Sequence, residues 1–333
     1  QVRPLLVYTP VGPNDGASLH VEDAPAGGPP VTARLFGKFC EHLGANIYQG
    51  MEAQILTNPT MARWRFSAGD NHPDGGVREE SDRARIEARI ASWASRHGWP
   101  DGVAVVDSYF DGGAYGWFRI GTRAQVTLGP ALDVRGGRAQ RVEVGGGGRG
   151  PAGIGQWVYL PLHRVRQFDY RLVARALGSA TVTLRLEQAA PPGAGAGAPA
   201  AAGSGQAPHD GTGVAIPGAA DPAAPGAAAG GAQVTVALAD GWRTVSGRLE
   251  LAADAPADAL YRFSLTVDTP AHLVLDRVLL YPADHVGGAD PEVIARLREA
   301  RLPLLRWPGG NFVSGYNWRD GVGPQDTRPS RPN

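Results

Sequence analysis

The densest group of side chains able to bind a small polar ligand lies near the end of the sequence, in the run LLRWPGGNFVSGYNWRDGVGP. Arg306 ends an apolar stretch, and Asn311 follows a Gly-Gly pair. Pro308 fixes its own φ and the glycines permit conformations closed to other residues, so this loop can hold both polar side chains over one small pocket. A guanidinium supplies a rigid fork of donors and a carboxamide supplies donors and an acceptor, which suits a polyhydroxylated ligand. From the residues alone, a loop tied down by its own polar groups is an equal alternative.

A second polar position, Glu41, lies in the run FCEHLG. The apolar residues before it predict a strand: Val31, Leu35 and Phe39. A lone glutamate is usually solvated, and the neighbouring His42 is more often a structural hydrogen bonder than a ligand. No His/Glu spacing here matches a zinc site, and a G-x-G-x-x-G match at Gly145 has no helix after it to receive a phosphate. We therefore expect neither a metal nor a cofactor.

These polar groups need rigid elements beside them, and the sequence predicts a helix and a strand before Arg306. Asp290 is a good N-cap and Pro291 occupies the first helical position. One apolar face follows, at Val293, Ile294, Leu297 and Ala300. The run LPLLRW, Leu302–Trp307, predicts a buried strand that opens into the Gly-rich loop. A helix, a buried strand and a long loop are typical of the active face of a parallel barrel.

Between these two ends the apolar pattern changes. Glu79–His97 predicts a short amphipathic helix with apolar residues at i, i+4 and i+7: Ile86, Ile90 and Trp93. From about residue 102 to residue 282 the period is two, and short runs such as ATVTLRLEQ and ALYRFSLTV are separated by Gly, Pro or Asp. This pattern predicts a β-sandwich. Ala189–Ala232 is nearly pure Ala, Gly and Pro, which predicts a flexible loop between two strands.

The composition argues against several classes of partner. The 32 Lys and Arg residues balance 32 Asp and Glu residues, so no single-sign field favours nucleic acid or an anionic membrane. No apolar run approaches the ~20 residues of a membrane span. Cys40 is the one cysteine, which excludes an internal disulfide and predicts a small buried thiol. The compartment, cytoplasmic or secreted, stays open because the sequence starts at Gln1 and a leader could have preceded it.

Two blocks of the sequence resemble family 51 glycoside hydrolases, the α-L-arabinofuranosidases. LFGKFCEHLGANIYQGM is similar to the first strand of their (β/α)₈ TIM barrel. DPEVIARLREARLPLLRWPGGNFVSGYNWRDGVGPQDTRP is similar to their first barrel helix, second strand and following loop. In that family the Glu of the first block and the Arg and Asn of the second contact the sugar in the −1 subsite. The resemblance therefore implies that Glu41, Arg306 and Asn311 are substrate-binding residues.

The same resemblance implies a domain organisation. Some members of the family carry a β-sandwich of carbohydrate-binding-module type between the first barrel strand and the first barrel helix. We therefore expect an α/β plus all-β chain, in which the start of a TIM barrel is interrupted by an inserted jelly-roll-like β-sandwich. The expected boundaries are 1–57 for the first barrel strand, 58–286 for the sandwich, and 287–333 for the barrel helix, second strand and loop. Five aromatic residues are candidates for sugar stacking, although packing in the core is the more frequent role: Tyr109, Tyr115, Trp117, Trp157 and Trp242.

The implied activity is retaining hydrolysis of terminal α-L-arabinofuranosyl residues from arabinoxylan- or arabinan-type substrates. Retaining hydrolysis needs two carboxyl groups about 5–5.5 Å apart. In the family both are glutamates on later barrel strands, so we expect these 333 residues to be a fragment without catalytic residues and without activity of its own. A pair formed by Glu41 with Asp320 or Asp326 is the alternative.

Two other functions stay open. An endo-β-glucanase or xylanase of the same family would cleave interior bonds of a polymer. A non-catalytic carbohydrate-binding fragment would bind sugar without cleaving it. The expected partner is an arabinose-containing oligo- or polysaccharide, and full-length members of the family often form homo-oligomers.

Overall fold

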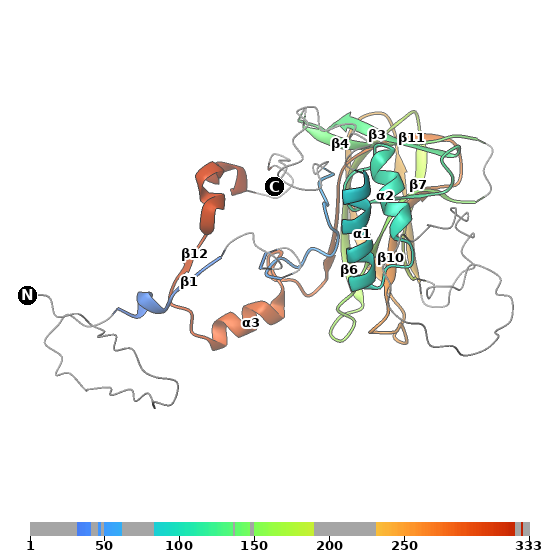
Figure 1. Ribbon diagram of the computed structural model, residues 1–333. Helices are drawn as coiled ribbons and strands as arrows, with labels where there is room; N and C mark the ends of the chain where they lie inside the picture. The colour runs from blue at the N-terminus through green and yellow to red at the C-terminus, as the bar shows by residue number, and fades with distance from the viewer. Residues whose placement is uncertain are drawn as a thin grey trace, which may run out of the picture.

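The computed structural model describes residues 32–40, 46–47, 50–61, 83–135, 137–146, 150–189, 231–323 and 328. Most of these residues form a β-sandwich, and a smaller group of elements stands to one side of it (Figure 1). Residues 190–230 of the predicted Ala/Gly/Pro loop lie outside the described part, whereas Ala232 already belongs to a strand. None of the helices in the described part of the chain is long and apolar enough to cross a membrane.

Two five-stranded antiparallel sheets form the sandwich. The first contains, in spatial order, β2 (Phe118–Ile120), β5 (Ala152–Val158), β10 (Tyr261–Val267), β7 (Ala180–Gln188) and β8 (Ala232–Leu238). The second contains β3 (Val126–Leu132), β4 (Arg138–Val144), β11 (Ala271–Pro282), β6 (Gln167–Leu177) and β9 (Arg243–Glu250). The chain passes repeatedly from one sheet to the other, which is a jelly-roll-like winding, and the prediction of a sandwich is confirmed.

The period-two pattern of the strands places one face of each sheet in a shared core. In β7, Val182, Leu184 and Leu186 are 0% exposed, while Thr183 and Arg185 between them face outward. The core formed in this way takes residues from both sheets. Complete burial of one such aliphatic side chain contributes about 1.5–3 kcal/mol, so this shared core is what holds the two sheets together.

A segment outside the named strands, residues 53–59, completes the second sheet beside β11. β4 pairs with β11 only as far as Leu275. Farther along β11, the backbone N–H of Val278 donates to the carbonyl oxygen of Pro59 over 2.7 Å. Met61 follows and is 0% exposed in the main core. The chain that leads into the sandwich is therefore part of its packing.

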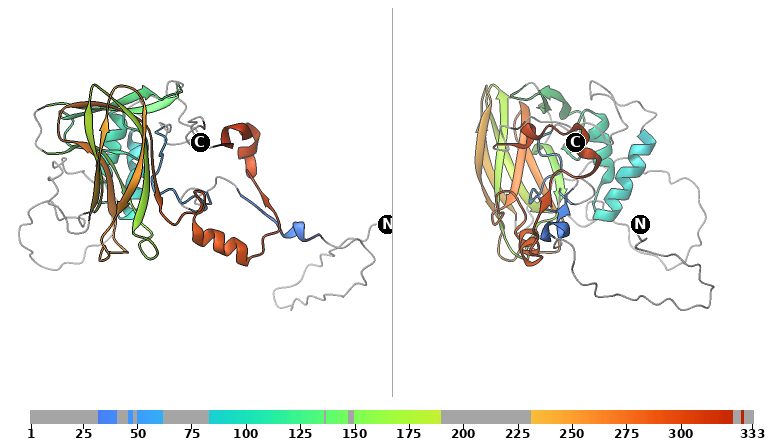
Figure 2. Two further views of the ribbon diagram at one scale, coloured as in Figure 1. Left: turned by 180° about the vertical axis from the view of Figure 1, so that it is seen from behind. Right: turned by 90° about the vertical axis from the view of Figure 1, so that its left-hand side faces the viewer.

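Two helices cover the outer face of the first sheet at its β2–β5 edge (Figure 2). α1 (Arg83–His97) confirms the predicted amphipathic helix, of which residues 79–82 lie outside the described part. α2 (Gly102–Phe110) lies where strand periodicity was expected, and that expectation is wrong. The side chain of Asp101 accepts a hydrogen bond from the backbone N–H of Ala104 and starts the helix, whose apolar residues then pack against α1.

The smaller group contains β1 (Lys38–Phe39), α3 (Pro291–Glu299) and β12 (Leu305–Arg306). β1 and β12 pair in parallel although the whole sandwich separates them in sequence. α3 begins at the predicted N-cap, because the side chain of Asp290 accepts hydrogen bonds from the first backbone N–H groups of the helix. Together the three elements form a strand–helix–strand unit at one side of the sandwich (Figure 1).

Two predicted strands in this unit are shorter and more exposed than expected. Ala33–Phe36 is a 3₁₀ helix, η1, and Val31 lies outside the described residues. Of Leu302–Trp307, only two residues are in a strand, and the side chains are not buried: Leu305 is 38% and Trp307 42% exposed. The physical reason is that a two-stranded parallel ribbon has few ladder bonds, and none of the described residues covers it on both faces.

Candidate functional site

The predicted site lies where β1 and β12 end side by side. Phe39 is opposite Arg306 in the parallel register. The backbone N–H of Cys40 donates to the carbonyl oxygen of Arg306 over 2.9 Å, and that of Gly309 donates to the carbonyl oxygen of Cys40 over 2.6 Å. Cys40, the residue immediately before Glu41, is therefore hydrogen-bonded through its backbone to Arg306 and to Gly309, the two ends of the turn.

Glycine is required where this turn crosses β1. A Cβ atom at Gly309 would overlap the ring of Phe39 and would lie 3.1 Å from the carbonyl oxygen of Cys40. The next residue, Gly310, has a φ of +61°, a conformation that L side chains rarely adopt. The Gly-Gly pair of the sequence therefore allows the close approach of the loop to the first strand.

Arg306 is exposed, and its guanidinium lies over an aromatic ring. Its Cζ atom is 5.2 Å from the centroid of the Phe39 ring, within the range of a cation–π contact. This contact leaves the donors of the guanidinium at the surface, where they can bind the oxygen atoms of a ligand.

The structure does not place the other two predicted side chains. Glu41 lies outside the described residues, and Asn311 is described only by its backbone, in the 3₁₀ helix η3 (Gly310–Gly315). The substrate-binding assignment therefore stays a prediction. Of the carboxylates considered as alternative partners of Glu41, Asp320 accepts a hydrogen bond from the amide of Asn317 over 3.1 Å, and Asp326 lies outside the described residues.

The thiol beside this site is buried, as predicted. Cys40 is 8% exposed and forms no disulfide. Across the residues that the structure describes, no group of three or more His, Cys, Asp or Glu side chains is arranged to hold a metal ion.

The aromatic residues suggested for sugar stacking are mostly packed inside. Three are nearly inaccessible, with exposed fractions of 7%, 2% and 1%: Tyr109, Tyr115 and Trp117. Trp157 is partly buried and stacks on Phe118 with a centroid distance of 4.0 Å. Trp242 is partly buried, with the guanidinium of Arg175 5.5 Å from its ring. Tyr109, Tyr115 and Trp157 pack in the cluster between the two helices and the first sheet, and Trp117 packs in the main core, so the role of these four is in packing.

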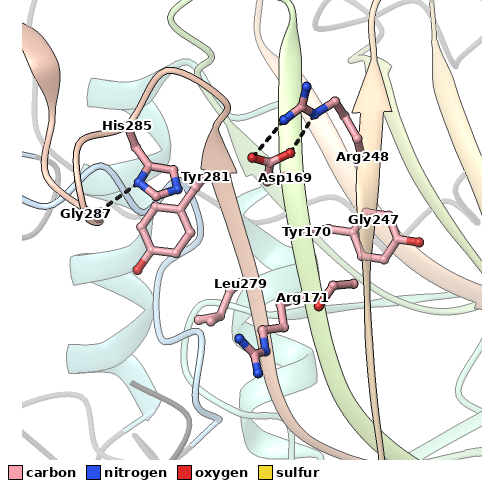
Figure 3. Close-up of a pocket in the computed structure, with 11 residues that line it drawn as sticks. Asp169, Tyr170, Arg171, Gly247, Arg248, Leu279, Tyr281, His285 and Gly287 are labelled. Atoms are coloured by element: carbon pink, nitrogen blue, oxygen red, sulfur yellow. Dashed lines mark hydrogen bonds and ion pairs between the residues drawn. The ribbon is translucent and has the colours of Figure 1, made fainter. Parts of the chain in front are cut away.

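A groove that the sequence did not indicate lies on the outer face of the second sheet (Figure 3). Its volume is about 660 Å³. Side chains from three neighbouring strands and from the connector that follows β11 line it, among them Asp169, Arg171, Arg248, Leu279, Tyr281 and His285. The signal in the sequence was the alternation of FDYRLVARAL, which places Asp169 and Arg171 on the same outward face.

The sandwich with a parallel strand–helix–strand unit beside it is similar in fold to a glycoside hydrolase. An arabinose-bound family 51 α-L-arabinofuranosidase superposes on 88% of this chain with a TM-score of 0.51 and 14% sequence identity. The match covers 38% of that enzyme. At 14% sequence identity this match shows a similarity of fold alone.

Sequence similarity to curated relatives is stronger and shorter. An intracellular exo-α-(1→5)-L-arabinofuranosidase of Halalkalibacterium halodurans is 53% identical over 51 residues, which are 15% of this chain and 10% of the relative. The corresponding enzyme 1 of Bacillus subtilis is 46% identical over 56 residues, 16% of this chain and 11% of the relative. The probable α-L-arabinofuranosidase C of Aspergillus clavatus is 49% identical over 51 residues, again 15% and 10%.

The chain therefore spans about a tenth of the length of the curated relatives it matches. No family model matches it. Its resemblance to family 51 α-L-arabinofuranosidases extends over most of this chain in fold and over a short segment in sequence.

Proposed function

We propose that β1, α3 and β12 are the first strand, first helix and second strand of a (β/α)₈ barrel, and that the sandwich is inserted between the first two. The domains are then 1–57, 58–286 and 287–333, with the end of the first one, residues 53–57, packed against the sandwich. The parallel pairing of Phe39 with Arg306 is the observation that supports this proposal, because parallel neighbours joined through a helix are the repeating unit of such a barrel.

The exposed apolar residues of this unit fit the same proposal. Parallel sheets are normally covered on both faces, whereas here large apolar side chains point into solvent on the ribbon and its loop. They include Phe39 at 58%, Leu304 at 48% and Trp318 at 63% exposure. In a complete barrel, further strands and helices would cover these side chains.

The proposed activity of the complete protein is that of a non-reducing-end α-L-arabinofuranosidase. It removes terminal arabinofuranosyl residues from arabinoxylan- or arabinan-type hemicellulose with retention of configuration. Arg306, Asn311 and Glu41 bind the sugar in the −1 subsite. The acid/base and the nucleophile, both glutamates of later barrel strands in the family, lie outside this sequence.

The test is an assay of arabinose release from a synthetic aryl α-L-arabinofuranoside. We expect no turnover by these 333 residues alone and turnover by the longer protein that carries the two glutamates. In that longer protein, Arg306→Ala removes charge-assisted hydrogen bonds to the sugar and should lower kcat/KM roughly ten- to a hundredfold. This corresponds to a loss of about 1.5–3 kcal/mol of transition-state stabilisation.

Arg319→Ala is the matched control, because Arg319 is an exposed arginine of the same loop and lies over Trp318, with a distance of 5.6 Å from its Cζ to the ring centroid. Wild-type kcat/KM in the Arg306→Ala enzyme would show that the subsite assignment is wrong. Appreciable turnover by the 333 residues alone would show that the carboxyl groups are present in this chain.

A further inference from the structure

The groove on the second sheet has side chains in two regular rows. β11, β6 and β9 are neighbours, and their registers bring Leu279, Arg171 and Ser246 into one row across the sheet. The next row contains Tyr281, Asp169 and Arg248. Residues two apart on a strand face the same side, so all six lie on the outer face. The volume of about 660 Å³ is within the range of small-molecule sites.

An ion pair fixes one side of the groove. Nε of Arg248 donates to Oδ1 of Asp169 over 2.6 Å, and Nη2 donates to Oδ2 over 3.2 Å. This fork-to-fork geometry holds both planar groups at the edge of the groove (Figure 3). Because Asp169 neutralises Arg248, the groove is not a strongly cationic surface of the kind that selects a polyanion.

An aromatic pair forms the opposite side. The rings of Tyr281 and His285 are 5.0 Å apart between centroids and inclined by 47°. The backbone N–H of Gly288 donates to Nδ1 of His285 over 2.8 Å, so in the neutral ring the proton is on Nε2. Figure 3 shows Nε2 turned toward the groove, where it is an oriented donor.

The close packing of β6 and β9 below this surface depends on a glycine. Gly247 is opposite Tyr170, and a Cβ atom there would overlap the Tyr170 hydroxyl. The Tyr170 side chain is buried in the core at 5% exposure, and its burial raises the pKa of the phenol. The rows of the groove are therefore held on a rigid sheet.

We propose that this groove binds a short stretch of a neutral saccharide, at a site separate from the loop of Arg306. The donors of Arg171, Arg248 and His285 suit the many acceptor oxygens of a sugar, and the nearly buried Leu279 and Tyr281, at 4% and 9% exposure, form the floor beneath them. A peptide lying across the groove cannot pair with β6 as an extra strand, because β6 is already paired on both edges; the edge strand on this side of the sheet is β9.

The experiment is a titration of the 333-residue chain with a linear arabino-oligosaccharide and with xylohexaose, followed by ¹H–¹⁵N NMR. We expect at least one of them to shift the amide signals of Arg171, Ser246 and Gly288. His285→Ala and Arg171→Ala each remove donors and should weaken binding about tenfold. Ser246→Trp places a large side chain in the first row and should abolish detectable binding, while the thermal unfolding transition of all three variants stays that of a folded sandwich.

Two controls locate the ligand. Arg185→Ala removes an arginine from the outer face of the other sheet, where it bonds to Gln233, and should leave the affinity unchanged. The amide signals are the second control: a ligand in the groove shifts those of Arg171, Ser246 and Gly288 whatever happens at the loop of Arg306, so a failure of the proposed arabinofuranosidase activity does not affect this result. The proposal is overturned if neither oligosaccharide binds, if folded groove variants bind as the wild type does, or if the shifted signals are confined to the loop of Arg306.

Discussion

Three glutamine side chains lie in the interior and bond to backbone groups that no strand pairs. Oε1 of Gln54 accepts from the N–H of Leu280 over 3.0 Å, and Oε1 of Gln140 accepts from the N–H of Ala114 over 2.6 Å. Gln156 makes a two-point contact with Thr57, donating to its carbonyl oxygen over 2.6 Å and accepting from its N–H over 3.0 Å. Buried amides are therefore what attach the irregular segments to the sheets.

Gln156→Leu should lower the free energy of unfolding by about 1–3 kcal/mol. The substitution keeps most of the side-chain volume but leaves the N–H and the carbonyl of Thr57 without their partner inside the protein. Chemical denaturation followed by circular dichroism measures the change. Gln233→Leu is the control, since Gln233 is exposed and bonds to the exposed side of Arg185. Equal stability of the two variants would contradict this role of Gln156.

The sequence could have revealed Gln156 but not its partner. In AGIGQWV, Gln156 has the same parity as Ile154 and Val158, so the strand pattern itself places the amide inward. Nothing local indicates that Thr57, far away in the sequence, would need it. The same limit applies to the candidate site: the motif picked out Arg306, whereas the groove at His285 depends on which strands become neighbours.

At the scale of elements, α3 is attached to the sandwich through charged groups at its start. Asp290 caps the helix and also accepts from Nη2 of Arg164 over 2.8 Å. Burial raises the pKa of Asp290, but hydrogen bonds from Arg164 and from the N–H groups of Val293 and Glu292 outweigh it, so the pKa lies below its usual value of 3.8. The ionised carboxylate is therefore the form that the folded helix start favours.

Asp290→Asn removes the negative charge of the side chain but keeps the N-cap hydrogen bonds, because asparagine is as good an N-cap as aspartate. Loss of the ion pair should lower the opening free energy of α3 by about 1 kcal/mol at neutral pH. A lowered pKa gives stability that is complete above the usual pKa and lost as the pH falls through the folded value. The difference between wild type and variant should hold down to about pH 4 and shrink in stronger acid.

Hydrogen exchange at the amide of Ile294, which bonds to the carbonyl oxygen of Asp290 over 3.0 Å, measures this opening. Asp290→Ala is the companion variant. It loses the cap as well and should open more easily than Asp290→Asn at every pH. A pH-independent difference for Asp290→Asn would mean that the charge of the carboxylate does not contribute.

The strands around the Ala/Gly/Pro segment lead to a second prediction about elements. β7 and β8 are antiparallel neighbours, with Leu186 opposite Ala232 in the register. Since the two chain ends lie side by side, a four- or five-residue Gly-containing turn can replace residues 190–230. Thermal unfolding should change by no more than about 2 °C, because loop length alters closure entropy only slowly. A loss of ten degrees or more would show that the removed residues contribute to packing.

Strand runs were predictable here and helix α2 was not, for a physical reason. Val182, Leu184 and Leu186 are apolar at every second position because one face of their sheet is buried. The pattern in the sequence therefore reflects the structure directly. The run GVAVVDSYF is apolar at nearly every position, which fits a buried helix as well as a strand. Asp101, which caps the helix in the structure, is the residue that could have indicated it. The exposure of Leu305 could not be predicted either. The apolar run LPLLRW indicates a strand that becomes buried, but it does not indicate which elements bury it.

At the scale of the whole molecule, buried and exposed apolar surfaces are divided between two parts. The main core contains residues of the sandwich strands and of the segment at Leu56 and Met61. β1, α3 and β12 contribute none of its residues, and no residue of α3 is buried. The sandwich should therefore have its stability from its own packing, whereas the strand–helix–strand unit depends on partners for its exposed apolar side chains.

A protein of residues 50–289 should consequently unfold at a temperature within about 2 °C of the full chain, in one cooperative transition. It keeps both sheets, and after removal of Asp290 Arg164 still has its ion pair with Asp284, at 3.4 Å. A protein of residues 62–289 differs by only twelve residues, counted from 50 to 61, but lacks Leu56, Met61 and the partner of Gln156. It should unfold at least about 5 °C lower, because two core side chains and several backbone bonds are lost.

Circular dichroism during heating measures the unfolding temperatures of both proteins. If the 50–289 protein lost its cooperative transition, the core would have to extend into the strand–helix–strand unit; if the two proteins unfolded at the same temperature, the lead-in segment would be an accessory to the sandwich and not part of it.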